Sequence, residues 1–159
     1  MNGIFDAREL AAYISKKYIE KFNKNVSPVR IQKTLYFCFA YWGGFVRRGK
    51  QNNSDISVEN LSEYLFANKI EAWVYGPVIP DVYFESNIDK YYNSNMFVGK
   101  EMEKELIDNV IEDTFEINDF RLVDISHKDN AWISKFHYDE QFHNNEIKKE
   151  DIISEYARS

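Results

Sequence analysis

The stretch SPVRIQKTLYFCFAYWGG, residues 27–44, carries the strongest helix signals in the sequence. Ser27 is a good N-cap, and Pro28 suits the first helical position because the amide that proline lacks has no partner there. Gly43-Gly44 predicts the end of the helix. From Leu35 onward the segment is apolar almost all round, so we expect this helix to run through the centre of the fold.

The first turns of this helix are its polar part. Arg30, Gln32 and Lys33 stand there, and we expect only these turns to reach solvent. They are therefore candidates for contact with a partner, and Lys33→Glu is expected to weaken such contact without unfolding the protein. Cys38 lies among aromatic residues farther along, where we expect a buried thiol rather than a nucleophile.

Further helices are predicted on both sides of the central one. Residues 6–22, 102–111 and 148–156 repeat apolar residues at helical spacing. Residues 47–62 are polar and are expected to form a surface loop, with a short helical turn near its end.

Two asparagines are expected to cap short helices in the last third of the chain. Asn118 precedes a segment in which Phe120, Val123 and Ile125 are the candidate core positions. Asn130 follows a polar turn and is expected to cap the helix after it.

The stretch EYLFANKIEAWVYGPVIPDVY, residues 63–83, combines apolar runs with turn signals. Asn68-Lys69 divides two short runs, which predicts a β-hairpin. Gly76-Pro77 is expected to end its second strand, because proline has no amide to donate. Pro80 then suits the start of another helix, from which Tyr83 would pack inward.

These elements predict a mainly α fold, a single compact helical domain over residues 1–159 with a small antiparallel β-hairpin; an α+β fold is the alternative. A chain of 159 residues that is 44% hydrophobic and 29% charged is typical of one globular domain. The net charge of −6 argues against direct nucleic-acid binding. We find neither a signal peptide nor the roughly 20 apolar residues of a membrane helix, so we expect a cytoplasmic protein with no membrane partner.

Signs of catalytic chemistry are missing from the sequence. His127, His137 and His143 do not have the spacing of a zinc-protease helix, and one cysteine cannot build a Cys-rich metal site. The glycines form neither a phosphate-binding loop nor a dinucleotide fingerprint. We therefore expect no enzyme activity, no cofactor and no metal, although an unrecognised histidine–carboxylate site stays open as an alternative.

Three separated stretches carry a family resemblance: SPVRIQKTLYFCFAYW, IEAWVYGPVIPDVYFE and LVDISHKDNAWI. Together they resemble the Panacea domain, the family of SocA-like antitoxins and phage-associated proteins, over about residues 7–157. The positions that fit its central motif are Glu71, Ala72, Trp73, Tyr75, Gly76, Pro77, Val78 and Pro80. The chain departs from the pattern at Thr34, where leucine is usual, at Ser126 before the histidine, and at Ala131 before a tryptophan.

The resemblance implies a mostly helical antitoxin that binds and neutralises a cognate protein toxin, often in a prophage, with delivery of the toxin to a host protease as one mode. The candidate partner-binding residues are Arg30, Gln32, Lys33, Tyr36, Tyr75, Pro77 and His127. Structural roles compete with this reading: Trp73, Trp132 and Tyr36 are expected in the core, and Gln32 and Lys33 are equally able to hydrogen-bond to the YGPV corner. His127 is equally suited to a structural polar cluster.

A different class of function is the alternative. A small acidic protein of phage type could inhibit a host defence nuclease, such as a CRISPR complex, by occupying its basic nucleic-acid channel. The 20 basic residues mixed among 26 acidic ones make the charge modest for that role.

Overall fold

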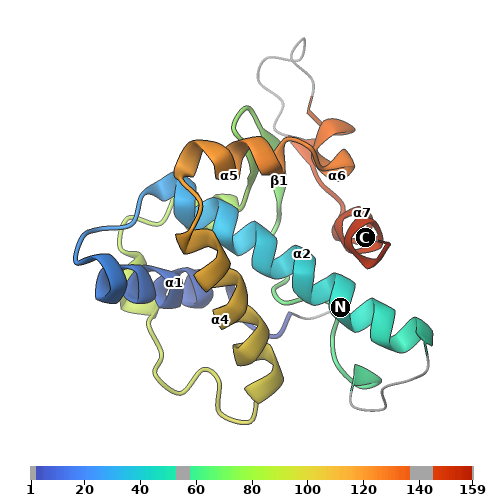
Figure 1. The fold of residues 1–159 in the computed structure, drawn as a ribbon, viewed down its shortest axis with the longest axis horizontal. Helices are drawn as coiled ribbons and strands as arrows, with labels where there is room; N and C mark the ends of the chain where they lie inside the picture. The colour runs from blue at the N-terminus through green and yellow to red at the C-terminus, as the bar shows by residue number, and fades with distance from the viewer. Residues whose placement is uncertain (1–2, 53–57, 137–144, 159) are drawn as a thin grey trace.

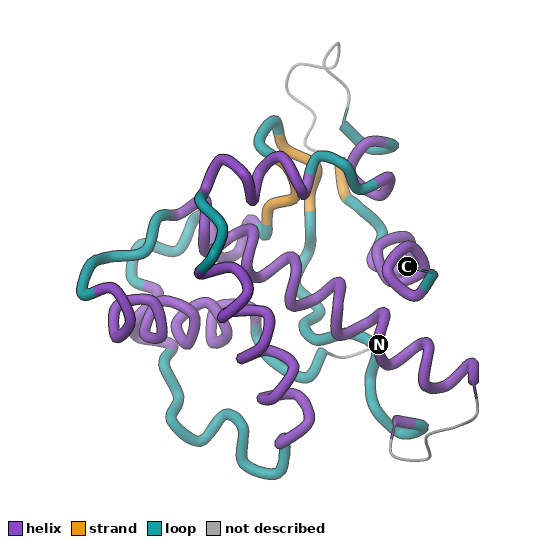
Figure 2. The backbone as a smooth tube through the Cα atoms, in the orientation of Figure 1, coloured by secondary structure: helices purple, strands orange, loops and turns teal. Residues whose placement is uncertain are grey.

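The computed structural model describes residues 3–52, 58–136 and 145–158. Within these ranges the chain forms seven α-helices and a small three-stranded antiparallel sheet, so the predicted mainly α fold class is confirmed. Helix α2 (Pro28–Asn52) crosses the middle of the molecule and the other helices lie around it (Figure 1). The strands gather at one edge, near the end of α5 (Asp119–Ser126) (Figure 2).

The remaining helices include those predicted from periodicity. The other elements are α1 (Ala7–Phe22), β1 (Glu71–Trp73), β2 (Gly76–Val78), α3 (Pro80–Tyr83), η2 (Ile88–Tyr91), α4 (Glu101–Phe115), α6 (Asn130–Ile133), β3 (Asn145–Glu146) and α7 (Lys149–Ala157). No helix in the described ranges is long and apolar enough to cross a membrane.

Helix α2 is longer than the sequence predicted. It continues through Gly43-Gly44, so the expected helix end there is wrong, and residues 47–52 of the expected loop are helical. The two glycines instead allow α7 to pack closely against α2. A Cβ added to Gly43 would lie 2.5 Å from Ile153 Cγ1, and one added to Gly44 would lie 2.9 Å from the Tyr156 backbone carbon.

The predicted hairpin exists, but its turn is displaced. Strands β1 and β2 pair antiparallel around Val74 and Tyr75, not around Asn68-Lys69, and β3 adds to the other edge of β1. Pro77 lies within β2, opposite Ala72, instead of ending a strand. An edge strand tolerates a proline because its outer side needs no ladder hydrogen bond.

Asn68 has a different role from the predicted turn. Its Oδ1 accepts a hydrogen bond from the Ala7 amide at 2.9 Å, and its Nδ2 donates to Asp81 Oδ2 at 2.8 Å. The start of α1 is thereby joined to the first turn of α3. Asp6 caps α1 as expected, since its side chain accepts from the Arg8 amide at 2.8 Å.

The end of the predicted loop and the short helices give mixed outcomes. Leu61 N–H donates to the Val58 carbonyl oxygen at 3.1 Å, which confirms a helical turn there, whereas residues 53–57 lie outside the described ranges. Asn118 caps α5 as predicted. Asn130 is the first residue of α6 and not its cap.

The prediction that Phe120 of α5 is a core residue is wrong. Phe120 is 85% exposed, and the residues of α5 that are buried are Leu122 and Ser126. The spacing of four between these two places them on one face of the helix, and Phe120 lies off that face.

Candidate functional site: an aromatic surface on a locked hairpin

Gln32 on α2 holds the chain where β2 leads into α3. Its Oε1 accepts a hydrogen bond from the Ile79 amide at 2.7 Å, and its Nε2 donates to the Ile79 carbonyl oxygen at 3.3 Å. Both groups are buried. One side-chain amide therefore satisfies both backbone groups of a residue that lies between two elements, where regular structure offers no partner.

Lys33 reaches the same hairpin from the next position of α2. Its Nζ donates to the Pro77 carbonyl oxygen at 2.8 Å, and its side chain is 1% exposed. Burial lowers the pKa of Lys33 from 10.5 to about 7, because removal from water disfavours the charged amine.

Gly76 is required beside this lysine. Its φ is +107°, and an added Cβ would lie 2.5 Å from Ser126 Oγ and 3.2 Å from Lys33 Nζ. An alanine would therefore meet both an unfavourable backbone conformation and a filled space. The glycine at this position is a packing requirement of the hairpin.

The α5–α6 segment holds the turn of the hairpin from the other side. His127 Nε2 lies 3.1 Å from the Val74 carbonyl oxygen, and Trp132 Nε1 donates to the Trp73 carbonyl oxygen at 2.8 Å. The rings of His127 and Trp132 stack with their centroids 4.2 Å apart. We call Gln32, Lys33, His127 and Trp132, with the backbone groups they bind, the hairpin lock.

A second polar cluster joins α2, α6 and α7. Tyr36 and Tyr156 both donate hydrogen bonds to Asp129 Oδ2, the latter at 2.6 Å. Burial raises the pKa of Asp129, although the two hydroxyl donors oppose this shift. Glu155 on α7 accepts from the amides of Asn130 and Ala131, both at 2.9 Å, and so caps the start of α6.

Arg30 belongs to a third buried contact. Its guanidinium donates to the carbonyl oxygens of Thr114 and Ile117, and its Nε lies 3.0 Å from Asp119 Oδ1. These carbonyls come from the end of α4 and the residues after it, where the intrahelical donors run out. The arginine therefore fixes the path of the chain from α4 into α5.

The solvent exposure expected for the start of α2 is wrong. Arg30, Gln32 and Lys33 are all buried, because the polar atoms find partners on elements that are distant in the sequence. The expected hydrogen bond of Lys33 to the YGPV corner is confirmed at Pro77, whereas Gln32 binds Ile79, the residue that follows this corner. Tyr36 and Pro77 are buried as well, and His127 is half-buried.

Tyr75 is the predicted partner-binding residue that is well exposed, at 65%. It stands in the hairpin turn beside Val74, which is also exposed. Trp73, just before them, packs its ring against Tyr83 and Phe84 of the α3 region, at centroid distances of 4.8 and 6.2 Å. We call these five residues the aromatic surface.

The sequence reading missed two members of this surface. Tyr83 was expected to pack inward but is 53% exposed, and Phe84 is 74% exposed. At α3 the buried positions are Ile79, just before the helix, and Val82 within it, and the two aromatic residues that follow Val82 are exposed.

Some of the metal-ligating side chains and the single thiol considered in the sequence can be placed in the described ranges. No cluster of three or more His, Cys, Asp or Glu residues is placed there to hold a metal ion. Cys38 is buried as expected, and burial raises the pKa of its thiol, so the reactive thiolate is disfavoured. His137 and His143 lie outside the described residues.

Comparison with known families supports the resemblance. Residues 55–133 match the family described as Antitoxin SocA-like, Panacea domain. The chain is thus identified as carrying this domain, and the family description supports a general antitoxin role. The match includes the hairpin, the aromatic surface and His127, whereas Gln32 and Lys33 precede it. Neither the curated proteins nor the solved structures that were compared match the chain.

Proposed function

We propose that the protein is an antitoxin that neutralises a cognate protein toxin by direct binding, and that the aromatic surface is the toxin-binding site. The observation that carries this proposal is the exposure of Tyr75, Tyr83 and Phe84 on a rigidly held hairpin and helix. Large exposed rings are the side chains that most often dominate the binding energy of protein interfaces.

The hairpin lock favours binding through preorganisation. Gln32 and Lys33 form hydrogen bonds from α2 to the backbone of β2 and the residue after it. His127 and Trp132 form hydrogen bonds to the turn that carries Tyr75. A surface that is already ordered loses less conformational entropy when a partner docks. Some residues predicted to bind the partner, such as Arg30 and Tyr36, are buried. We therefore assign them the role of positioning the aromatic surface rather than contacting the toxin.

The proposal includes no catalytic step. An antitoxin that blocks its toxin by binding needs a stable interface, which typically buries about 1,600 Å² of surface in total. It needs no reacting group. Delivery of the bound toxin to a host protease is compatible with the same surface, since an adaptor also has to hold its cargo. A phage or prophage setting, which the resemblance implies, would place the toxin in an adjacent reading frame.

Co-expression with the product of the adjacent gene tests the proposal. We expect the wild-type protein to restore growth and to co-purify with that product in a fixed ratio. A Tyr75→Ser, Phe84→Ser double variant should fold normally but fail in both assays. Phe120→Ser is the matched control, because it removes an exposed phenylalanine outside the aromatic surface.

Two results would contradict the proposal. If the double variant rescues growth as well as the wild type does, the toxin binds elsewhere. If no adjacent product is toxic and the protein instead blocks a CRISPR nuclease in a cleavage assay, the inhibitor function replaces the antitoxin function.

Protease delivery needs a separate readout. In cells that express the antitoxin, an adaptor would shorten the half-life of the toxin, whereas an occupancy inhibitor would leave it unchanged or lengthen it. Following toxin half-life after translation is stopped, with and without the antitoxin, distinguishes these modes.

A further inference from the structure

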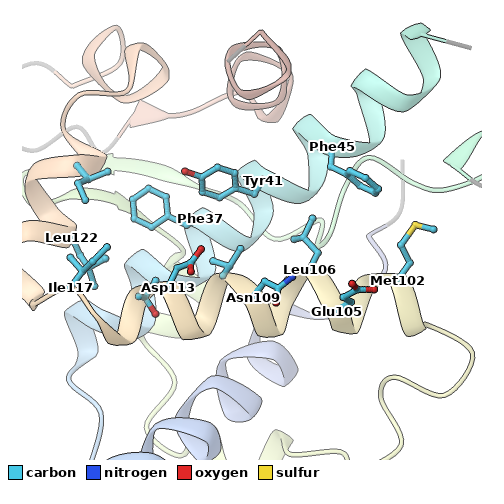
Figure 3. Close-up of a pocket in the computed structure, with 13 residues that line it drawn as sticks. Phe37, Tyr41, Phe45, Met102, Glu105, Leu106, Asn109, Asp113, Ile117 and Leu122 are labelled. Carbon is cyan, nitrogen blue, oxygen red and sulfur yellow. The ribbon is translucent and has the colours of Figure 1, made fainter. Parts of the chain in front are cut away.

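A groove with a volume of about 700 Å³ runs between α2 and α4 and shares no residue with the aromatic surface (Figure 3). Phe37, Tyr41 and Phe45 form its α2 wall. Their spacing of four residues places the three rings on one face of that helix. Leu106 and Val110 line the facing side on α4. The groove is therefore bounded by two apolar helix stripes.

The groove is open to solvent along one side. Tyr41 is half-exposed, and Glu105, Asn109 and Asp113 are exposed along α4. In Figure 3 the side chains of Tyr41, Leu106 and Asn109 project into the space between the two helices. An elongated, open groove with apolar walls suits a long occupant better than a small enclosed ligand.

The charges of the groove have a single sign. Glu105 and Asp113 line it, and its described lining includes no Lys, Arg or His. Within the described ranges neither carboxylate forms an ion pair or hydrogen bond. By contrast Asp108, also on α4, pairs with Lys104 at 2.7 Å. The groove thus offers two uncompensated acids beside its apolar walls.

The spacing of these acids specifies a ligand geometry. Glu105 and Asp113 are eight residues apart on one helix, which corresponds to about 12 Å. On a helix lying alongside α4, two cations seven or eight residues apart would match them. The α4 wall from Met102 to Thr114 is about 18 Å long, which equals roughly 13 helical residues.

We propose that this groove binds an amphipathic α-helix of a partner protein. The apolar face of the partner helix would lie against the rings of α2. Two Lys or Arg residues on one side of that face would pair with Glu105 and Asp113. A second copy of this chain is a poorer occupant, because two copies with a net charge of −6 each repel one another. The proposal does not depend on the aromatic surface or on the antitoxin role.

A synthetic helical peptide of about 15 residues tests the proposal by fluorescence anisotropy. It carries leucines at helical spacing and two lysines seven residues apart, and a matched peptide carries glutamates in place of the lysines. We expect saturable binding of the lysine peptide that weakens as salt is raised, and binding of the glutamate peptide at least about tenfold weaker.

Charge reversal in the groove locates the peptide. Asp113→Lys should weaken binding of the lysine peptide about tenfold and strengthen binding of the glutamate peptide. Glu112→Lys is the matched control, because it makes the same charge change at an exposed neighbouring position that does not line the groove. Circular dichroism of both variants confirms that they fold.

Several outcomes would overturn the proposal. They are absence of saturable binding to the wild-type protein, equal affinity for both peptides, and equal weakening by Asp113→Lys and Glu112→Lys. Self-association of the wild-type protein at micromolar concentration that Asp113→Lys abolishes would assign the groove to a second copy, and would overturn it too.

Discussion

The start of α2 and the hairpin beside it differ in which side chains they bury and which they expose to solvent. On α2 the polar ends of Gln32 and Lys33 point into the protein and bind the backbone of Ile79 and Pro77. On the hairpin and α3 side, the rings of Tyr75 and Phe84 face water. The polar side chains are buried and the aromatic ones are exposed.

This contrast separates scaffold from binding surface. A buried polar side chain stabilises when it satisfies a backbone group that has no other partner. An exposed ring contributes little to folding, yet it supplies apolar area to any protein that covers it. Substitutions at the two regions should therefore affect stability and binding in opposite proportions.

Lys33→Glu should give the largest loss of stability. It places a carboxylate against the Pro77 carbonyl oxygen in a site from which water is excluded. We expect a loss of roughly 3–5 kcal/mol in the free energy of unfolding, the range found for uncompensated buried charges. Urea denaturation measures it.

The earlier expectation that this variant folds normally rested on an exposed lysine, which the structure contradicts. Lys33→Met is the control that keeps the length of the side chain without a charge. Wild-type stability in Lys33→Glu would mean that Lys33 is not buried in solution.

The pH dependence of stability should show the same burial. Because folding lowers the pKa of Lys33 to about 7, the unfolded chain binds one more proton between about pH 7 and pH 10.5. The contribution of Lys33 to the free energy of unfolding therefore rises with pH across that window, with a slope of at most about 1.4 kcal/mol per pH unit.

The measurement is urea denaturation from pH 6 to pH 9, which stays about one unit below the ordinary pKa of tyrosine, with Lys33→Met beside the wild type. The variant should lack the rise. Parallel profiles for the two proteins would show that the amine titrates normally in the folded state.

Gly76→Ala should give a smaller loss, of about 1–3 kcal/mol. The new methyl group meets Ser126 Oγ in a backbone conformation that alanine adopts poorly. Gly99→Ala is the matched control, because Gly99 also has a positive φ, of +73°, but an added Cβ would have no neighbour within 4 Å. Thermal unfolding of both variants should show the larger loss at Gly76; equal losses would contradict a cost of the close approach to Ser126.

Local patterns in the sequence predicted the helices well, and long-range contacts account for the errors. Gly43-Gly44 has the composition of a helix end, yet it is the contact made by Ile153 of α7 that decides its role. Asn68 is a residue type common in turns, but its side chain accepts a hydrogen bond from the Ala7 amide at the start of α1. In each case the deciding partner is far away in the chain, where periodicity carries no information.

The candidate site was predicted in part for the same reason. Tyr75 was chosen through its place in the YGPV corner, and it is exposed. Arg30 and Lys33 were chosen because they are polar, but the carbonyl groups that accept their hydrogen bonds lie at the end of α4 and on β2. Phe84 was missed because an isolated phenylalanine is ordinarily a core residue.

The most direct test of the division between scaffold and binding surface measures stability and toxin affinity on the same variants. For Tyr75→Ser with Phe84→Ser we expect a change within about 0.5 kcal/mol in the free energy of unfolding, as for most surface substitutions. We expect its affinity for the co-purified toxin to fall by about a hundredfold or more, because each lost aromatic anchor costs at least about 1–2 kcal/mol. Phe120→Ser should change neither quantity. Wild-type affinity in the double variant, or a loss of affinity that only follows a loss of folding, would contradict the assignment of the aromatic surface as the toxin-binding site.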